Sequence, residues 1–208
     1  FYDVVTNPYG WGMFVHTVLA AWVLGGFFVL GVSSWHLLRG SNTDFFRRSF
    51  RMVAPFTLIF ALLLALSGDQ QGKTVAKYQP AKLAAMEAHW ETQTDVPFYL
   101  LVWPDPENET NTVQAIGIPG LLSWIAYDDV HAEVKGLKGF AKEDRPPVLP
   151  TFLSFRTLVA LGGIFLALSL WAFLQRKKEV PNKVLLKLLV FNIPLPYIGL
   201  MVGWAVTE

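Results

Sequence analysis

The sequence predicts an all-α integral membrane protein with four transmembrane helices and a long extracytoplasmic loop between the second helix and the third. Its composition is strongly apolar: 53% of the 208 residues are hydrophobic, with eight Trp and sixteen Phe, and the mean hydropathy is +0.39. Four segments are apolar over the roughly 20 residues that a helix needs to cross a bilayer. Basic residues gather in two short connections. These features are typical of a multi-pass membrane protein and exclude an ordinary soluble domain.

The four apolar segments form two pairs along the chain. They are residues 11–38, 50–67, 152–174 and 184–206. Pro55 lies in the first turns of the second segment, whereas Pro194 and Pro196 lie inside the fourth. A proline inside a transmembrane helix frees a backbone carbonyl and kinks the helix. We therefore expect the fourth helix to be bent.

The charges of the connections predict the orientation in the membrane. The two short connections are rich in basic residues and each contains one acidic residue. The first connection carries one acidic residue, Asp44, and the basic residues Arg39, Arg47, Arg48 and Arg51. The second carries Glu179 and the basic residues Arg176, Lys177, Lys178, Lys183 and Lys187. Residues 68–150 instead contain twelve Asp and Glu against seven Lys and Arg. The positive-inside rule then assigns the short connections to the cytoplasm and residues 68–150 to the outside.

These assignments divide the chain into three parts: a helix pair (1–67), an extracytoplasmic loop (68–150) and a second helix pair (151–208). Cysteine is absent, which excludes disulfides, thiolate metal sites and cysteine nucleophiles. The first residue is not Met, no signal-peptide pattern opens the chain, and no polar tail follows the last apolar segment. We expect both ends to continue into a longer assembly.

Three polar residues lie at the predicted outer ends of the helices: His16, Arg156 and Glu208. A polar side chain within a membrane span needs a partner, because hydrocarbon cannot solvate it. For His16 the candidates are haem iron and a hydrogen bond to a neighbouring helix. For Arg156 they are an anionic group, such as a haem propionate, and snorkelling to the interface. Glu208 fits equally well as an interfacial residue.

The long loop contains a helix-forming segment, AKLAAMEAHWETQ, at residues 81–93. Lys82 and Glu87 are five residues apart and do not share a helical face. Periodicity alone favours a solvated amphipathic surface helix. The alternative is a binding site for a quinol headgroup, in which a carboxylate accepts a proton and an ammonium binds the opposite oxygen. The segment WPDPENETN at 103–111 is typical of a turn.

Together these segments resemble subunit I of the cytochrome bd quinol oxidases. The resemblance covers nearly the whole chain but only the central to C-terminal part of the family subunit. Its motifs are FVHTV (14–18), FVLGVSSWHLLRG (28–40), SGDQQG (67–72), KLAAMEAHWETQ (82–93), SFR (154–156), IPLPYIG (193–199) and GWAVTE (203–208). The loop helix and the proline-bearing last helix are the most specific of these motifs.

The resemblance implies roles for individual residues. His16 corresponds to an axial ligand of low-spin haem b iron, and Arg156 corresponds to an arginine near that haem. Lys82 and Glu87 correspond to loop residues implicated in quinol oxidation. Glu208 corresponds to the ligand of the high-spin haem iron, and Trp204 to a tryptophan beside that centre. The implied cofactors are low-spin haem b, high-spin haem b and a third haem, d or b. The implied reaction is the reduction of dioxygen to water with electrons from quinol.

One residue departs from the family pattern. The family holds its low-spin haem between His and Met, and this Met falls two residues after the arginine, where the chain has Leu158. Leucine has no atom that ligates iron. The low-spin haem is then five-coordinate, ligated by another residue, or absent. The alternative function is therefore a degenerate bd-like membrane subunit with a structural or quinone-binding role and no low-spin haem.

The resemblance also implies partners. The family's N-terminal helices, which supply another histidine ligand and proton-conducting acidic residues, are missing from this sequence. We expect the chain to assemble with those helices, a second subunit and small accessory subunits, in the cytoplasmic membrane of a bacterium or archaeon. The expected ligands are lipid and quinol, and no nucleic acid is expected.

Overall fold

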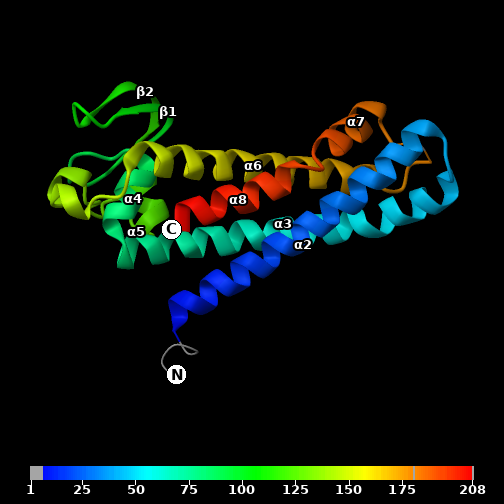
Figure 1. The fold of residues 1–208 in the computed structure, drawn as a ribbon, viewed down its shortest axis with the longest axis horizontal. Coiled ribbons are helices and arrows are strands. Elements are labelled where there is room, and N and C mark those ends of the chain that lie inside the picture. Colours follow the sequence, from blue (N-terminus) through cyan, green and yellow to red (C-terminus); the bar gives the residue numbers. More distant parts are fainter. Residues whose placement is uncertain (1–6, 180, 208) are drawn as a thin grey trace. The chain divides into compact units, whose positions relative to one another are not determined.

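The computed structural model describes residues 7–179 and 181–207. The chain forms two compact units: residues 1–68 with 157–204 (unit 1), and residues 69–156 with 205–208 (unit 2). Figure 1 shows the elements along the chain. They are α2 (Pro8–Arg39), α3 (Thr43–Tyr78), α4 (Pro80–Glu87), β1 (Phe98–Asp105), β2 (Thr110–Ile118), α5 (Leu121–Tyr127), η1 (Leu137–Gly139), η2 (Lys142–Asp144), α6 (Val148–Gln175), α7 (Lys183–Phe191) and α8 (Leu195–Thr207).

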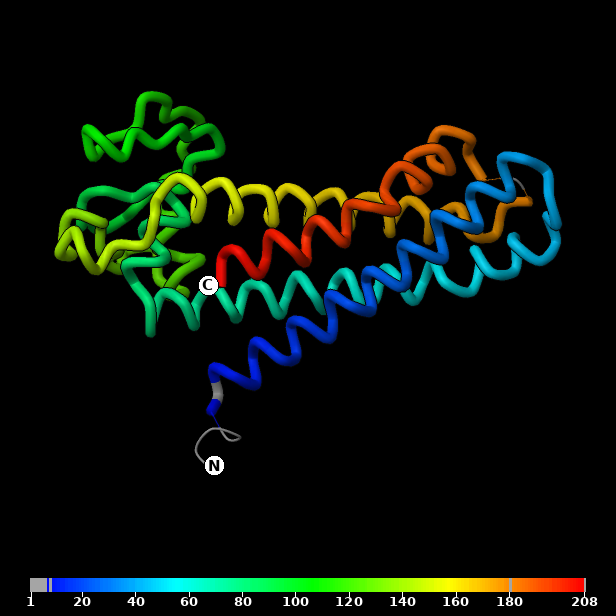
Figure 2. The backbone as a smooth tube through the Cα atoms, viewed as in Figure 1, coloured from blue at the N-terminus to red at the C-terminus, as the bar shows by residue number. Residues whose placement is uncertain are grey.

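The helices α2, α3 and α6 are long and apolar enough to cross a membrane. The pair α7 and α8 meets the same criterion together and is bent by 41° at a short break, which is visible in Figure 2. Pro194 lies in this break, and Pro196 lies in the first turn of α8, where a missing backbone N–H is tolerated. The predicted bend in the fourth apolar segment is therefore confirmed.

The second helix is longer than its apolar segment predicts. It spans 36 residues, or about 54 Å at 1.5 Å per residue, so it exceeds a bilayer core of about 30 Å. The expected boundary at residue 67 lies inside the helix. The following segment remains helical because its residues suit a polar helix: Lys73 pairs with Asp69 one turn earlier at 3.0 Å.

Unit 1 is held together by close helix contacts at two glycines of α2. A Cβ atom at Gly26 would lie 2.5 Å from the Thr57 hydroxyl oxygen of α3. A Cβ atom at Gly31 would lie 2.3 Å from the Ile193 side chain, between α7 and α8. Small residues allow this approach, which gives helices in a membrane their packing contacts. Around these contacts lie Val23, Phe27 and Leu30 of α2, with Phe165 of α6 and Leu189 of α7.

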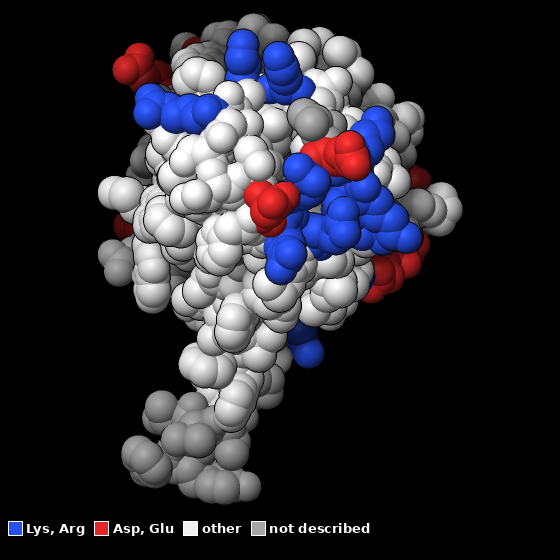
Figure 3. Space-filling view, turned by 90° about the vertical axis from the view of Figure 1, so that its right-hand side faces the viewer, with Lys and Arg blue, Asp and Glu red and all other residues white. Residues whose placement is uncertain are grey.

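The two basic connections lie at the same end of unit 1. The Arg51 Nε donates a hydrogen bond to the Arg176 carbonyl at 3.3 Å, which joins them directly. Figure 3 views this end and shows Lys and Arg side chains gathered on its surface. Their common position is what the positive-inside rule requires of two cytoplasmic connections.

Unit 2 contains the expected loop helix and an unexpected β-hairpin. Strands β1 and β2 pair antiparallel, with an irregularity between Trp103 and Pro104. The turn between them falls within the segment 103–111 that the sequence marked as a turn. The all-α prediction is thus wrong for this part of the loop. Both strands contain residues of high β-propensity, such as Tyr99 in β1 and Val113 in β2. Pro104 and Asp105 interrupt the alternation of β1 that would identify a strand.

Candidate functional site

The loop helix α4 forms because its sequence provides both a start and a stop. Pro80 occupies the first turn, four of its eight residues are Ala or Leu, and Ala88 ends the helix in the left-handed conformation at φ 51°. The expectation of a solvated surface helix is wrong, because residues 83–87 are all buried. Their small side chains allow α4 to sit in the core of unit 2, in contact with Trp90 and Leu137.

Glu87, the last residue of α4, forms a buried ion pair with Arg156 of α6. The Arg156 Nη2 donates to the Glu87 Oε2 at 2.6 Å, and the two side chains are 5% (Glu87) and 18% (Arg156) exposed. The Arg156 Nη1 donates to the Tyr99 carbonyl at 2.8 Å. The guanidinium also lies 4.7 Å from the ring centroid of Phe98. Arg156 is thus held by protein groups rather than by snorkelling to an interface.

Burial governs the protonation of Glu87. It raises the pKa of this carboxyl from 4.5 to about 7, although the Arg156 guanidinium opposes the shift. A carboxyl with a pKa near 7 exists in both protonation states at physiological pH. It is therefore able to accept a proton and release it again.

Lys82 lies in the first turn of the same helix and contacts the end of α8. Its Nζ donates to the Thr207 carbonyl of α8 at 2.9 Å, which satisfies a carbonyl at the helix C-terminus and places a cation at its negative end. Burial lowers the pKa of Lys82. Within unit 2, α4 thus uses one predicted quinol residue to contact the end of α8 and the other to contact α6.

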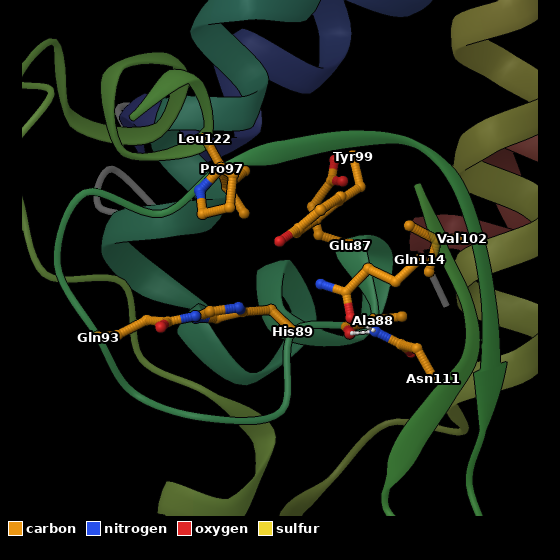
Figure 4. Close-up of a pocket in the computed structure, with 10 residues that line it drawn as sticks. All are labelled: Glu87, Ala88, His89, Gln93, Pro97, Tyr99, Val102, Asn111, Gln114 and Leu122. Atoms are coloured by element: carbon orange, nitrogen blue, oxygen red, sulfur yellow. Dashed lines mark hydrogen bonds between the residues drawn. The ribbon is translucent and has the colours of Figure 1, made fainter. Parts of the chain in front are cut away.

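A small polar cavity lies beside Glu87, between the end of α4, the segment that follows it and the hairpin (Figure 4). Its volume is about 20 Å³, which is enough for one water molecule and far below the several hundred Å³ of a typical small-molecule pocket. Its polar walls include His89, Tyr99 and Gln114. Asn111, which also lines it, donates to the Ala88 carbonyl at 3.1 Å.

His16 lies on α2, within unit 1, and contacts α3. Its Nδ1 is 3.0 Å from the Ser67 hydroxyl oxygen. The predicted alternative of a hydrogen bond to a neighbouring helix is therefore found. This bond is also compatible with iron ligation, because Nδ1–H donating to Ser67 leaves the Nε2 lone pair for a metal. Sequence reasoning missed Ser67, although it lies in the quoted motif at 67–72.

Two further predicted positions, Leu158 and Trp204, lie on α6 and α8. Leu158 packs against α8, where its Cδ2 would lie 4.0 Å from a Cβ atom at Gly203. Trp204 is 54% exposed, so its ring is available to groups outside this chain. Glu208 lies outside the described residues. Among the described residues, no cluster of three or more His, Asp or Glu side chains would hold a metal ion.

The comparison with known proteins decides the family. The profile of the family described as cytochrome bd terminal oxidase subunit I matches residues 1–208. The chain belongs to this family. It is 33% identical over 217 residues to cytochrome bd ubiquinol oxidase subunit 1 of Bacillus subtilis, with 99% of this chain and 46% of the relative covered. It is 29% identical over 276 residues to cytochrome bd-II ubiquinol oxidase subunit 1 of Escherichia coli, with 100% and 54% covered.

A solved structure agrees with this assignment. The bd oxidase from Geobacillus thermodenitrificans superimposes on the chain with a TM-score of 0.88 at 28% identity, covering 98% of this chain and 47% of that one. The chain spans about half the length of the curated relatives it matches. As a member of the subunit I family with several helices long and apolar enough to cross a membrane, it is a multi-pass membrane protein.

Proposed function

We propose that the chain forms part of a bd-type quinol oxidase, which oxidises quinol at the loop 68–150 and reduces dioxygen to water. The observation that carries this proposal is the buried pair of Glu87 and Arg156 on α4 and α6. A solvated surface helix would keep its carboxyl in water, because burial of a charge is unfavourable. A buried carboxyl with a shifted pKa is instead a common feature of catalytic sites. Family membership supplies the redox reaction that would use it.

In this proposal Glu87 accepts a proton from quinol, and Lys82 binds the opposite oxygen of the headgroup. The cavity beside Glu87 is of water size, so the quinol ring needs another face of α4 or a local opening of unit 2. Lys82 has to leave the Thr207 carbonyl to bind a quinol oxygen.

His16 would hold the low-spin haem b through Nε2, with Ser67 orienting the ring. When bound, this haem supplies one-electron transfer between quinol and the oxygen-reducing centre. Leu158 has no atom that would ligate iron, so any second protein ligand to this haem would have to come from another residue. Glu208 and Trp204 would belong to the high-spin haem centre, together with further helices of the oxidase and a second subunit.

The side of the membrane is also part of the proposal. The shared basic end of unit 1 would face the cytoplasm, and the loop with α4 would face outside. Protons taken from quinol would then leave on the outer side, which contributes to the proton gradient. The cells would be bacterial or archaeal.

A second candidate is favoured by Leu158 alone. It is a degenerate bd-like subunit that binds quinone or supports the assembly without a low-spin haem. A pyridine haemochrome assay of the purified complex separates the two candidates, since a complex without the low-spin haem holds less haem b.

The test of the proposed function is Glu87→Gln in the assembled oxidase. The glutamine keeps an oxygen that accepts from Arg156 but cannot take a proton. Quinol oxidation should fall by about 100-fold, the lower end of the effect of a positioned proton acceptor. Oxygen reduction with artificial donors should remain unchanged. Glu107→Gln, an exposed glutamate in the hairpin turn, is the matched control. Equal loss with both donors would contradict a quinol role for Glu87.

A further inference from the structure

A second titratable group, His89, lines the water-sized cavity beside Glu87. His89 comes two residues after Glu87, beyond the end of α4, and is only 8% exposed. His89 and His131, the two histidines of the loop, lack the spacing of metal ligands along the chain. The cavity makes His89 relevant, since one water in this space has Glu87 and His89 among its walls (Figure 4).

The hydrogen bonding of His89 leaves one ring nitrogen available to that water. Its Nε2 lies 3.3 Å from the Val134 carbonyl oxygen. A carbonyl only accepts hydrogen bonds, so Nε2 carries the hydrogen and Nδ1 is the unprotonated nitrogen. The neutral ring is thus able to accept a proton at Nδ1 and to release the other from Nε2.

The charged groups around His89 suit a transient proton carrier. Burial lowers its pKa, and the carboxylate of Glu91 opposes this shift. Burial therefore disfavours the charged imidazolium, which suits a group that passes a proton on. Glu91 is exposed at the surface of unit 2, where it pairs with Lys138 at 2.5 Å. Arg156 holds the Glu87 carboxyl by their ion pair.

We propose that His89 relays protons from Glu87 to the surface of unit 2 through one water in this cavity. The Glu87 carboxyl gives its proton to the water, the water gives a proton to the His89 Nδ1, and the imidazolium releases one to solvent near Glu91. One proton moves outward, Glu87 and the water return to their starting states, and the His89 ring returns from the Nδ1–H to the Nε2–H tautomer before the next proton arrives. The inference deepens the proposed function, because it assumes that Glu87 receives its proton from quinol.

The size of the cavity favours a proton relay rather than a second binding contact for quinol. About 20 Å³ excludes a quinol ring, which needs a pocket of several hundred Å³. Its polar walls, with Tyr99, Asn111 and Gln114 beside the two titratable groups, instead provide the two to four partners that a buried water needs.

The experiment is His89→Gln in the assembled oxidase, with His131→Gln as control. The introduced glutamine amide would still donate to the Val134 carbonyl but would carry no proton. His131 is a loop histidine that pairs with Asp95 at the surface. We expect His89→Gln to slow quinol turnover by about 10-fold, less than the loss of the primary acceptor, with KM for quinol unchanged. Added imidazole should restore the rate, and His131→Gln should behave as the parent protein.

Three outcomes separate the relay from the proposed function. The relay is supported if both Glu87→Gln and His89→Gln slow quinol turnover and imidazole restores the rate of His89→Gln alone. Slow turnover in Glu87→Gln alone overturns the relay and leaves the proposed function standing. Normal turnover in Glu87→Gln overturns both. The haem spectrum shows whether His89→Gln assembles. If it does not, Gln114→Leu replaces it, because this change removes a polar side chain that lines the cavity. Normal quinol turnover in Gln114→Leu would then overturn the relay.

Discussion

The protonation of Glu87 should make the stability of unit 2 depend on pH in an unusual direction. Its pKa is about 7 in the folded unit and 4.5 when exposed. Between these values the folded unit binds the proton and the unfolded chain does not. Stability is therefore highest below about pH 4.5 and falls as pH rises to about 7. Glu87→Gln stays neutral throughout and should lack this dependence.

The size of the effect follows from the two pKa values. A rise from 4.5 to about 7 corresponds to about 3 kcal/mol of stability lost on full ionisation. Glu87→Gln should then match the parent protein at low pH and exceed it by up to this amount at about pH 8. His89 contributes a slope of the opposite sign below pH 6.5, because its pKa is lowered. That slope is common to both proteins and cancels in the comparison.

Amide hydrogen exchange of residues 83–89 measures this pH-dependent stability directly in the assembled complex, since protection reports the free energy of local opening. The exchange rates are corrected for their intrinsic pH dependence. Glu107→Gln, in the exposed hairpin turn, should retain the parent profile. The reasoning fails if Glu87→Gln loses protection between about pH 4.5 and 7 as steeply as the parent protein does.

Three further predictions concern unit 1. His16→Ala should abolish the low-spin haem signal in a reduced-minus-oxidised spectrum, whereas Ser67→Ala should keep it with haem affinity lowered by about 10-fold; an unchanged spectrum in His16→Ala would remove this residue as a ligand. Leu158→Met should raise the midpoint potential of that haem in a redox titration, because a thioether ligand favours the ferrous state, and no change would mean that the position is not axial. Gly31→Ala should lower stability in detergent by about 1–3 kcal/mol through overpacking, whereas Gly25→Ala, with open space at its Cβ, should not; equal thermal melting curves would contradict the close contact with Ile193.

The membrane helices were predictable because their signal is local. A span of about 20 apolar residues is visible without knowledge of any neighbour. The bend between α7 and α8 was equally visible, because Pro194 removes a backbone donor wherever it lies. The hairpin was not predictable in this way, since Pro104 and the acidic turn interrupt the alternation of apolar and polar residues in β1. The length of α3 was missed because a helix continues past the end of its apolar segment when its polar residues still favour it.

The sequence by itself determined that this chain is a multi-pass membrane protein and which polar residues within it need a partner. The tertiary structure decided what those partners are. It paired Glu87 with Arg156 across 69 residues of chain and His16 with Ser67 across 51, and it buried α4 in a core instead of leaving it in solvent. Such pairings depend on how distant segments pack, and no periodicity or spacing along the chain records that. The pKa of Glu87 and the cavity beside it are consequences of that packing.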